Sequence, residues 1–596
     1  MNIIEERLSK LRKLMIDNAL DFYLITISDY HQSEFISDYF KTLKYMSGFT
    51  GSAGTLIVAK NKAYLWTDGR YFIQAEKELE NSSIILMKSG EDNVPTIFDF
   101  IIINLKKGMK LGFDGRTISA KNGLIYKLIA DENEADIVTT DDLVGKIWPA
   151  RPEFPHFKVF TNDLLKNSYP SNIKLNKIRK NLKSNRADLH LLSAIDDICW
   201  TLNIRGGDIP YSPLCLCHAL IGRDFYYLYI DEDKLSSDIK DYLSSLGIEI
   251  REYSEIYEDI KLIDSDIRLM LDMENINYLI YQSLSKKITI IDEINPEAYL
   301  KSIKNKKEIE NIKIAQLKDS IAHIKFMKWF KENIGGKELS EISVIEKLEF
   351  IRASMGGYIS PSFEPISASS SNGAIIHYSP YAQGNSEVKL NSYLLMDTGA
   401  NYYEGTTDIT RTYATGSLSI EMKNHFTLVA LSNLYLANAI FPYGCTGINL
   451  DTFARKPLWD RQIDFKHGTG HGLGNLLNVH EGPIGIRTHY IENQTEVFEN
   501  GMIVTDEPGI YIENYYGIRL ENELLVKNFK KNDFGSFLNF EILTLIPFDL
   551  DAINPDIMTK EEKNMLNEYH YLVFKKIKPH LNNDEAEWLK YYTRPI

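Results

Sequence analysis

The sequence predicts a chain of α/β and α+β domains: two α/β domains at residues 1–153 and 154–301, followed by an α+β domain at 302–596. Three observations support this. At 596 residues the chain is too long for one hydrophobic core, and its length favours three or four domains. Strand and helix patterns alternate up to a proline-rich segment at 149–155. In the third domain, long helical patterns are interleaved with strands that return on themselves.

The first domain opens with an amphipathic helix, because apolar residues between 3 and 18 recur at helical spacing. Residues 21–27 then form a predicted buried strand, and a glycine-punctuated turn follows at 45–54. Two further strands are predicted at 55–58 and 63–66, joined by a short polar turn.

The second domain repeats this order. A glycine turn at 202–207 precedes predicted strands at 217–221 and 225–230, and Asp231 ends the second strand, much as in residues 48–68. The parallel predicts a duplicated α/β module. Neither copy shows a convergent set of metal-binding or nucleophilic side chains, so we interpret both as scaffolding or substrate-shaping domains.

The third domain begins with a long predicted helix that ends at the glycine pair 335–336. Its apolar face is predicted from Ile314, Leu317, Ile321 and Ile324. Further helical patterns cover 338–353, 421–440 and 449–462, and a helix with a capping box formed by Thr559 and Glu562 follows.

Two predicted strand pairs complete this domain. Residues 388–397 return as 407–413, and residues 503–507 return as 518–526. Both pairs carry acidic residues close to their turns. The chemistry of the chain is therefore expected within roughly 302–550.

The composition excludes several classes of function. The net charge is −15 and no long Lys/Arg block occurs, which disfavours nucleic-acid binding. The N-terminus lacks the apolar segment of a signal peptide, and no apolar run approaches the ~20 residues that span a bilayer. Four cysteines cannot form a disulfide scaffold in a chain of this size, and Cys215 and Cys217 are predicted to be buried free thiols in an apolar strand. The expected location is the cytoplasm, with no membrane contact.

A glycine-rich loop at 467–474 contains two histidines and four glycines. So many glycines exclude the interior of a helix or strand and predict a tight loop that presents imidazoles to a cleft. Acidic residues lie on both sides of it in the sequence, at Asp397, Asp408, Glu507 and Glu521. One imidazole and four carboxylates can hold two divalent cations.

Charge favours this interpretation. Four carboxylates gathered in one cleft would raise one another's pKa unless cations neutralised them, and two divalent ions balance four negative charges. A water held between two such ions loses a proton near neutral pH and becomes a nucleophile. One nitrogen and many oxygens suit a hard or borderline ion such as Mn²⁺.

Taken singly, each residue has an ordinary structural explanation. An aspartate at a strand end is often a turn former, Glu521 could be an exposed strand acid, and the His377 imidazole could be packed in a core. Taken together, the order Asp-Asp-His-Glu-Glu with glycine-flanked spacings favours a metal site.

Several motifs resemble the aminopeptidase P family, the Xaa-Pro aminopeptidases among the pita-bread metallopeptidases. In the third domain they lie at 372–378, 396–400, 405–412, 467–474, 478–483 and 505–509. Residues 45–54 and 66–72 resemble the first domain of that family, and 588–596 resemble the ending of its long, three-domain cytosolic form. The resemblance implies two creatinase-type N-terminal α/β domains and a pita-bread catalytic domain with a C-terminal extension.

The resemblance also assigns the metal ligands. Asp397 would bind one ion, His471 and Glu507 the other, and Asp408 and Glu521 would bridge both. No ligand position departs from the family pattern.

Substrate-binding residues follow from the same resemblance. His377 and His480 resemble histidines that contact the substrate and steady the tetrahedral intermediate, and His467 resembles one that lines the proline-side pocket. Tyr511 and Arg519 match neighbouring motif positions.

The implied reaction is hydrolysis of the N-terminal Xaa-Pro bond of peptides that carry proline at the second position. A hydroxide held by the two metals would attack the carbonyl, and a metal and an imidazole would share the developing oxyanion. Glu507 would move a proton to the proline nitrogen. Arg70 resembles a first-domain arginine that reaches the substrate, and the family resemblance implies a homodimer.

Two alternatives remain. A prolidase-type dipeptidase shares the fold, although the two large N-terminal domains and the ending at 588–596 favour the aminopeptidase. A catalytically inactive pita-bread module used for binding is disfavoured by the full ligand set and by the lack of a long acidic tail.

Overall fold

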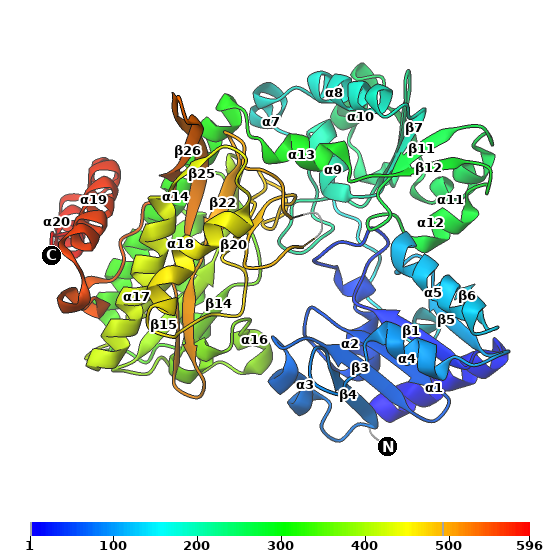
Figure 1. Ribbon diagram of the computed structural model, residues 1–596, viewed down its shortest axis with the longest axis horizontal. Helices are drawn as coiled ribbons and strands as arrows, with labels where there is room; N and C mark the ends of the chain where they lie inside the picture. Colours follow the sequence, from blue (N-terminus) through cyan, green and yellow to red (C-terminus); the bar gives the residue numbers. More distant parts are fainter. Residues whose placement is uncertain (1–2, 492–493) are drawn as a thin grey trace. The chain divides into compact units, whose positions relative to one another are not determined.

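The computed structural model describes residues 3–491 and 494–596, which form two compact units (Figure 1). The first unit contains the chain up to residue 161 and residues 170–297. The second unit contains residues 162–169 and 298–596. The first unit thus combines the two predicted α/β domains, and the domain boundaries drawn from the sequence stay predictions.

The first unit is built from two six-stranded sheets with the same strand order. The strand orders are β4-β3-β2-β1-β5-β6 and β10-β9-β8-β7-β11-β12. In each sheet the first three strands in sequence pair antiparallel with one another, and all other pairs are parallel. The predicted duplication is therefore confirmed. The strands are β1 (Phe22–Thr26), β2 (Thr55–Ala59), β3 (Ala63–Thr67), β4 (Ile84–Lys88), β5 (Lys110–Asp114), β6 (Asp136–Thr140), β7 (Leu189–Leu192), β8 (His218–Gly222), β9 (Tyr226–Tyr229), β10 (Glu249–Arg251), β11 (Arg268–Leu271) and β12 (Thr289–Asp292).

Helices accompany both sheets (Figure 1). They are α1 (Ile3–Asp17), α2 (Thr42–Ser47), α3 (Phe72–Glu78), α4 (Ile97–Asn104), α5 (Ala120–Glu132), α6 (Leu143–Lys146), α8 (Ser171–Ser184), α9 (Ile195–Leu202), α10 (Ser237–Ser245), α11 (Ile256–Asp259) and α12 (Tyr278–Ser283). The predicted opening helix is confirmed, since α1 buries Ile4, Leu8, Leu11 and Met15 at helical spacing. The predicted turn at 45–54 begins later than expected, because α2 continues to Ser47 and ends where Gly48 adopts a φ of 80°.

Three cysteines of the second sheet's module lie together, which corrects the prediction that neither module contains a convergent set. The sulfurs of Cys199, Cys215 and Cys217 lie within 4.8 Å of one another, and all three residues are buried free thiols. Cys215 and Cys217 precede β8 instead of alternating within it, and their segment packs against α9, which carries Cys199. The free, buried state was predicted correctly, whereas their meeting depends on tertiary packing.

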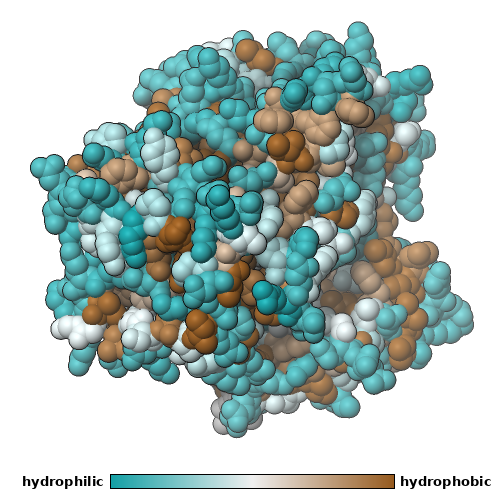
Figure 2. Space-filling view, turned by 60° about the vertical axis from the view of Figure 1, so that its left-hand side comes forward, coloured by the Kyte–Doolittle hydropathy of each residue, from teal (hydrophilic) through white to brown (hydrophobic). Residues whose placement is uncertain are grey.

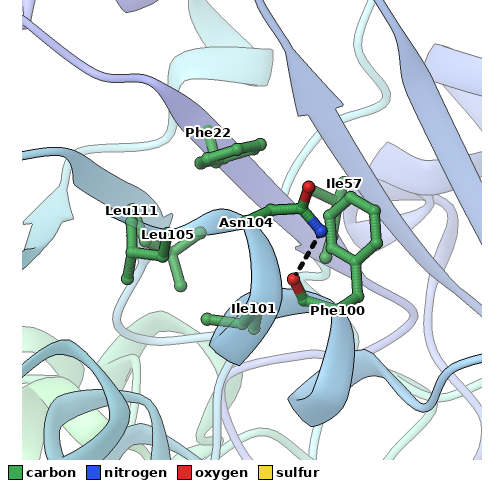
Figure 3. Close-up of a pocket in the computed structure, with 7 residues that line it drawn as sticks. All are labelled: Phe22, Ile57, Phe100, Ile101, Asn104, Leu105 and Leu111. Carbon is green, nitrogen blue, oxygen red and sulfur yellow. Dashed lines mark hydrogen bonds between the residues drawn. The ribbon is translucent and has the colours of Figure 1, made fainter. Parts of the chain in front are cut away.

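A small cavity in the first module is lined by Phe22, Ile57, Phe100, Ile101, Asn104, Leu105 and Leu111 (Figure 3). Its one polar side chain, Asn104, donates to the carbonyl oxygen of Phe100 at 2.8 Å. With no ionisable side chain in its lining, this cavity carries no catalytic chemistry.

The second unit contains several small sheets, of which two position the candidate site: β14-β15-β18 and β19-β26-β25-β22. Its strands are β13 (Tyr358–Pro361), β14 (Ile366–Ser369), β15 (Tyr393–Thr398), β16 (Ala400–Tyr402), β17 (Gly405–Thr406), β18 (Ile409–Ala414), β19 (Ile440–Pro442), β20 (Gly470–His471), β21 (Gly485–Ile486), β22 (Ile503–Asp506), β23 (Gly509–Ile512), β24 (Tyr516–Arg519), β25 (Asn522–Asn532) and β26 (Gly535–Ile542). Long antiparallel strand pairs were predicted here, and the observed pairs confirm them.

The second unit also contains helices, of which some lie against these sheets and others against neighbouring helices (Figure 1). They are α7 (Asp163–Ser168), α13 (Pro296–Ser302), α14 (Lys306–Asn333), α15 (Glu341–Ala353), α16 (Pro380–Gln383), α17 (Ile420–Ala437), α18 (Gly447–Trp459), α19 (Lys560–Ile577) and α20 (Asn583–Tyr592). The core includes Phe426 and Leu434 of α17, Ile518 of β24 and Leu566 of α19. The predicted capping box of the terminal helix is present, with Thr559 and Glu562 satisfying each other's backbone amides.

The buried face of α14 differs from the one predicted. Ile321 and Ile324 are buried, but Ile314 is 44% exposed. The inner face instead contains polar residues, among them Asp319 and His323, which are completely buried. An apolar periodicity cannot detect a helix face whose buried positions are partly ionisable.

Hydrophilic residues predominate on the face seen in Figure 2, and hydrophobic residues are interspersed among them. Within residues 3–491 and 494–596, no helix combines the length and the apolar character that a membrane-crossing segment requires.

Candidate metal centre

The strand pair β15–β18 positions the first two predicted ligands. The strands are antiparallel and Asp397 lies opposite Thr410, so Asp397 stands near the end of β15 and Asp408 immediately before β18. The hairpin β16–β17 connects them. The predicted meeting of both carboxylates at one end of a strand pair is confirmed.

Glu507 and Glu521 occupy matching places in the second strand pair. Asp506 of β22 lies opposite Asn522 of β25, so each glutamate is the residue just beyond that last pair. The Glu521 amide donates to the carbonyl oxygen of Thr410 at 3.0 Å, which joins this end of the pair to β18. Backbone pairing therefore brings the acidic ends of both strand pairs together.

The glycine-rich loop packs directly against β22. Gly470 and His471 form a two-residue strand with Gly485 and Ile486, which corrects the prediction of a purely loop segment. A Cβ at Gly470 would lie 1.9 Å from the carbonyl oxygen of Thr505, so only glycine permits this approach. The Glu507 amide donates to the Thr469 carbonyl oxygen at 2.8 Å, which fixes the loop to the glutamate.

Three of the five predicted ligands form one cluster. One atom each from Asp408, His471 and Glu521 lie within 4.8 Å of one another. The Nε2 atom of His471 is 3.3 Å from Oδ2 of Asp408 and 3.6 Å from Oε1 of Glu507. Asp397 contributes a carboxylate whose Oδ2 accepts from Arg519 at 2.6 Å.

Burial and mutual repulsion raise the pKa values of Glu507, Glu521 and Asp397. Burial, together with the charges of Asp408 and Asp397 and against the attraction of His471, raises the pKa of Glu507 to about 7. Burial raises the pKa of Glu521 well above its ordinary value, and the neighbouring carboxylates add to this. The pKa of Asp397 is also raised by burial, although Arg519 opposes the shift. The cluster thus binds positive charge, as protons or as cations.

The donor set fits two divalent cations. The Nδ1 atom of His471 lies 3.0 Å from the Gly472 carbonyl oxygen and donates to it, which directs Nε2 at the acids. The Oδ1 atom of Asp397 is buried and has no hydrogen-bond partner. Four carboxylates and one imidazole suit a hard or borderline divalent ion.

Three of the predicted substrate residues form a hydrogen-bonded chain that leads to Asp397. Arg519 donates from Nη1 to the Tyr511 hydroxyl at 2.9 Å, and this hydroxyl donates to Nε2 of His467 at 2.8 Å. Nδ1 of His467 donates to the Gly468 carbonyl oxygen at 2.7 Å. Burial and the positive charge of Arg519 lower the pKa of His467 to about 3, so its imidazole is neutral.

The other predicted histidines are exposed. The ring of His480 lies edge-on to that of His471, with centroids 4.3 Å apart. His480 lies in a loop, because residues 473–482 have no strand pairing. His377 is exposed in the segment after the 3₁₀ helix at Ser370–Ala374, while the neighbouring Tyr378 is buried, so the alternative of a packed imidazole is wrong.

Arg70 belongs to the first unit. It lies between β3 and α3, and its guanidinium forms an ion pair with Asp68 at 2.7 Å. Its contact with substrate stays a prediction.

Asp506 lies outside the cluster of Asp408, His471 and Glu521. Its carboxyl group is completely buried and neither oxygen has a hydrogen-bond partner. Burial, and then the charge of Glu507, raises the pKa of Asp506 well above its ordinary value, which favours its uncharged form.

Sequence reasoning missed several residues that support the ligands. The Thr410 hydroxyl donates to Oε2 of Glu521 at 2.7 Å, and Oε1 of Glu523 accepts from the Asp408 amide at 2.7 Å. On α18, Arg455 donates to the His467 carbonyl oxygen at 2.9 Å, and Asp451 accepts from the Thr469 hydroxyl at 2.6 Å. Alternation at Glu521 and Glu523, and the four-residue spacing of Asp451 and Arg455, were the signals available.

Comparison with known families covers almost the whole chain. Residues 310–528 match metallopeptidase family M24 and 536–596 match the C-terminal region of peptidase M24. Residues 7–146 and 150–308 match two creatinase/prolidase N-terminal domain families.

Curated relatives match over their full length. The chain is 37% identical to Xaa-Pro aminopeptidase 1 of Dictyostelium discoideum, covering 100% of this chain and 97% of the relative. It is 36% identical to a probable Xaa-Pro aminopeptidase P of Coprinopsis cinerea, covering 99% and 98%.

Solved structures agree. The X-prolyl aminopeptidase of Caenorhabditis elegans, described as a cytosolic enzyme with a di-nuclear active site, matches with a TM-score of 0.94 and 32% identity over 100% of both chains. A prolidase of Thermococcus sibiricus, at 22% identity and a TM-score of 0.51, covers 64% of this chain and 99% of its own and shares the fold.

The raised pKa of Glu507 predicts that the metal-free protein loses stability as the pH rises. The folded state holds this proton up to a pKa of about 7, whereas an unfolded glutamate releases it near 4.5. The contribution of this proton to the free energy of unfolding is therefore complete below pH 4.5 and is lost as the pH rises past 7. It amounts to about 1.4 kcal/mol for each pH unit that separates the folded and unfolded pKa values. Urea unfolding of chelator-treated protein at pH 5.5 and 7.5 measures this, and Glu507→Gln should reduce the difference. An unchanged difference in that variant contradicts the assignment.

Proposed function

Because the chain belongs to metallopeptidase family M24, among the Xaa-Pro aminopeptidases with two creatinase-type N-terminal domains, we propose that it removes the N-terminal residue of peptides that carry proline second. The observation that carries this proposal is the convergence of Asp408, His471 and Glu521, with Asp397 and Glu507 beside them. Full-length similarity to Xaa-Pro aminopeptidases supports the choice of substrate.

We assign the ligands as the family resemblance implies. Asp397 would hold one ion, His471 and Glu507 the other, and Asp408 and Glu521 both. We propose manganese, since the set contains eight carboxylate oxygens and one imidazole nitrogen. Bound divalent ions would supply Lewis acidity toward the peptide carbonyl and lower the pKa of a water molecule that acts as nucleophile.

Glu507 is suited to moving a proton. As a carboxylate beside the nucleophilic water, it would take up the proton of that water and pass it on. Bound cations would lower its pKa below the value of about 7 that it has in the metal-free protein. The Thr505 hydroxyl donates to its Oε1 at 3.3 Å, so Oε2 is the oxygen free to take a proton and deliver it to the leaving proline nitrogen.

The histidines and Arg519 would place the peptide. His480, exposed beside His471, would donate to the carbonyl oxygen of the Xaa-Pro bond as that oxygen gains charge. The neutral ring of His467, held by Tyr511, would lie on the proline side. His377 and Arg70 would contact the rest of the substrate.

The alternatives make different predictions. A prolidase-type dipeptidase would cleave dipeptides and leave tripeptides intact, and an inactive binding module would bind no metal. The convergence of Asp408, His471 and Glu521 opposes the second alternative. We further propose a cytosolic location, by analogy with the worm enzyme. A homodimer is proposed from the family resemblance alone.

Removal of metal should abolish activity. Chelator-treated protein is expected to lose hydrolysis of Arg-Pro-Pro, and added Mn²⁺ is expected to restore it better than other divalent ions. Stability should rise with bound metal by about RT ln(1 + [L]/Kd). The measurement is proline-peptide release after metal analysis, with Arg-Ala-Pro as the substrate control. Full activity after confirmed metal loss would exclude the mechanism, and cleavage of Arg-Pro alone would favour the dipeptidase.

Glu521→Gln and Asp506→Asn should differ sharply although both remove one carboxylate at this strand end. Glu521 lies in the ligand cluster, so the variant should lose one ion and more than 100-fold of activity, beyond the 10- to 100-fold typical of residues that only support ligands. Asp506 lies outside this cluster and its raised pKa favours the uncharged acid, so Asp506→Asn should keep both ions. The metal content and the kcat/KM of both purified variants test this ranking. The opposite ranking would show that the ligand set is wrong.

His480→Ala should separate substrate contact from metal binding. The exposed ring touches His471 but is not placed among the ligand atoms, so the variant should keep two metals and the wild-type unfolding midpoint. A loss on the order of 10²–10³ in kcat is expected for one oxyanion donor. Loss of metal in this variant would instead identify His480 as a ligand.

A further inference from the structure

A buried ion pair lies behind the strand ends that carry Asp397 and Asp408. Asp319 of α14 and Arg352 of α15 are completely buried. The guanidinium makes two hydrogen bonds to the carboxylate, from Nε to Oδ1 at 2.8 Å and from Nη2 to Oδ2 at 3.0 Å. This fork geometry orients both groups rigidly.

Each partner also binds a residue next to a proposed metal ligand. On the aspartate side, the hydroxyl of Thr407, the residue before Asp408, donates to Oδ2 of Asp319 at 2.6 Å. On the arginine side, Nη2 donates to the hydroxyl of Thr398, the residue after Asp397, at 3.1 Å. The pair therefore connects the two strand ends.

The two strand ends are joined once more through Thr407. Its hydroxyl oxygen accepts from the Ala400 amide at 2.9 Å, and its own amide donates to the Ala400 carbonyl oxygen at 2.8 Å. Arg352 also donates from Nη1 to the Gly399 carbonyl oxygen at 3.1 Å. Hydroxyl, carboxylate and guanidinium thus form one continuous network around the segment that separates the ligands.

The ion pair at the centre of this network is charged. Burial alone would raise the pKa of Asp319, but the charge and hydrogen bonds of Arg352 and the hydroxyl of Thr407 leave this pKa below its ordinary value. The neighbouring His323 is neutral, because burial lowers its pKa to about 3, and its Nε2 accepts from Nη2 of Arg352 at 3.0 Å. A buried ion pair is a weak source of stability compared with apolar packing. Stability alone therefore does not explain why this pair contacts the strands that carry the ligands.

We propose that Asp319 and Arg352 are positioning residues that set the spacing of Asp397 and Asp408, acting through Thr407 and Thr398. The inference rests on the proposed function, since it takes both aspartates as metal ligands. Preordered ligands lose less conformational freedom when the ions bind, so disruption of the network weakens metal affinity.

The far end of the same strand pair supplies a matched control. The hydroxyl of Thr415 accepts from the Ser392 amide and donates to the Ser392 carbonyl oxygen, both at 2.9 Å. Thr415 is buried like Thr407 and lies beyond the other end of β18. Thr407→Val and Thr415→Val therefore remove equivalent hydroxyls, one beside the ligands and one remote from them.

The experiment measures the Mn²⁺ affinity of the full-length protein by competition with a chelator, together with urea unfolding of the metal-free form. Thr407→Val should bind Mn²⁺ about 10- to 100-fold more weakly. Thr407→Ser, which keeps the hydroxyl, and Thr415→Val should bind as the wild type does. Thr398→Val tests the arginine side independently, and it carries the test if Thr407→Val does not fold.

Two results would overturn the inference alone. The first is wild-type Mn²⁺ affinity in Thr407→Val, or in Thr398→Val if Thr407→Val does not fold. The second is an equal loss of Mn²⁺ affinity in Thr415→Val that follows its loss of stability. Asp408→Ala distinguishes this failure from that of the proposed function. If Asp408→Ala keeps both ions, the ligand assignment fails and the inference fails with it. If it loses them while Thr407→Val binds normally, only the positioning role is refuted.

Discussion

Repulsion among buried carboxylates is the constraint on which the second unit depends. Asp397, Asp408, Glu507 and Glu521 would separate if they stood on flexible loops, since burial and proximity raise the pKa values of three of them. Each instead stands at or beside the end of a hydrogen-bonded strand, and the two strand pairs are joined through the Glu521 amide. The backbone ladders thus hold together side chains that repel one another.

The elements near the site were predictable because local signals agree with the tertiary structure there. Glycines at turns and acids at strand ends indicated both strand pairs, and the spacing of the acids indicated a shared cleft. The arrangement of the supporting residues could not be predicted in this way. Asp319, for example, lies on a helix face where an apolar pattern was expected, and its partner Arg352 comes from another helix.

The errors have the same physical origin. The cysteines at 199, 215 and 217 meet only because α9 packs against the segment before β8. The short strand at Gly470 and His471 forms because a partner at 485–486 comes close. The two modules of the first unit, by contrast, were recognised as a duplication from their order of turns and strands, and their equal sheet topology reflects that order. Local order is encoded locally, whereas contacts between distant segments are not.

The hydrogen-bonded chain from His467 through Tyr511 and Arg519 to Asp397 has a thermodynamic consequence. Under the proposed assignment it connects the group that receives the proline side of the substrate with an oxygen-donor ligand of a cation. A molecule that alters the hydrogen bond at His467 would change how strongly Arg519 attracts the Asp397 carboxylate. Linkage is reciprocal, so the identity of the bound ion then changes the affinity for that molecule by the same factor. Inhibitor rankings obtained with one metal are therefore specific to that metal.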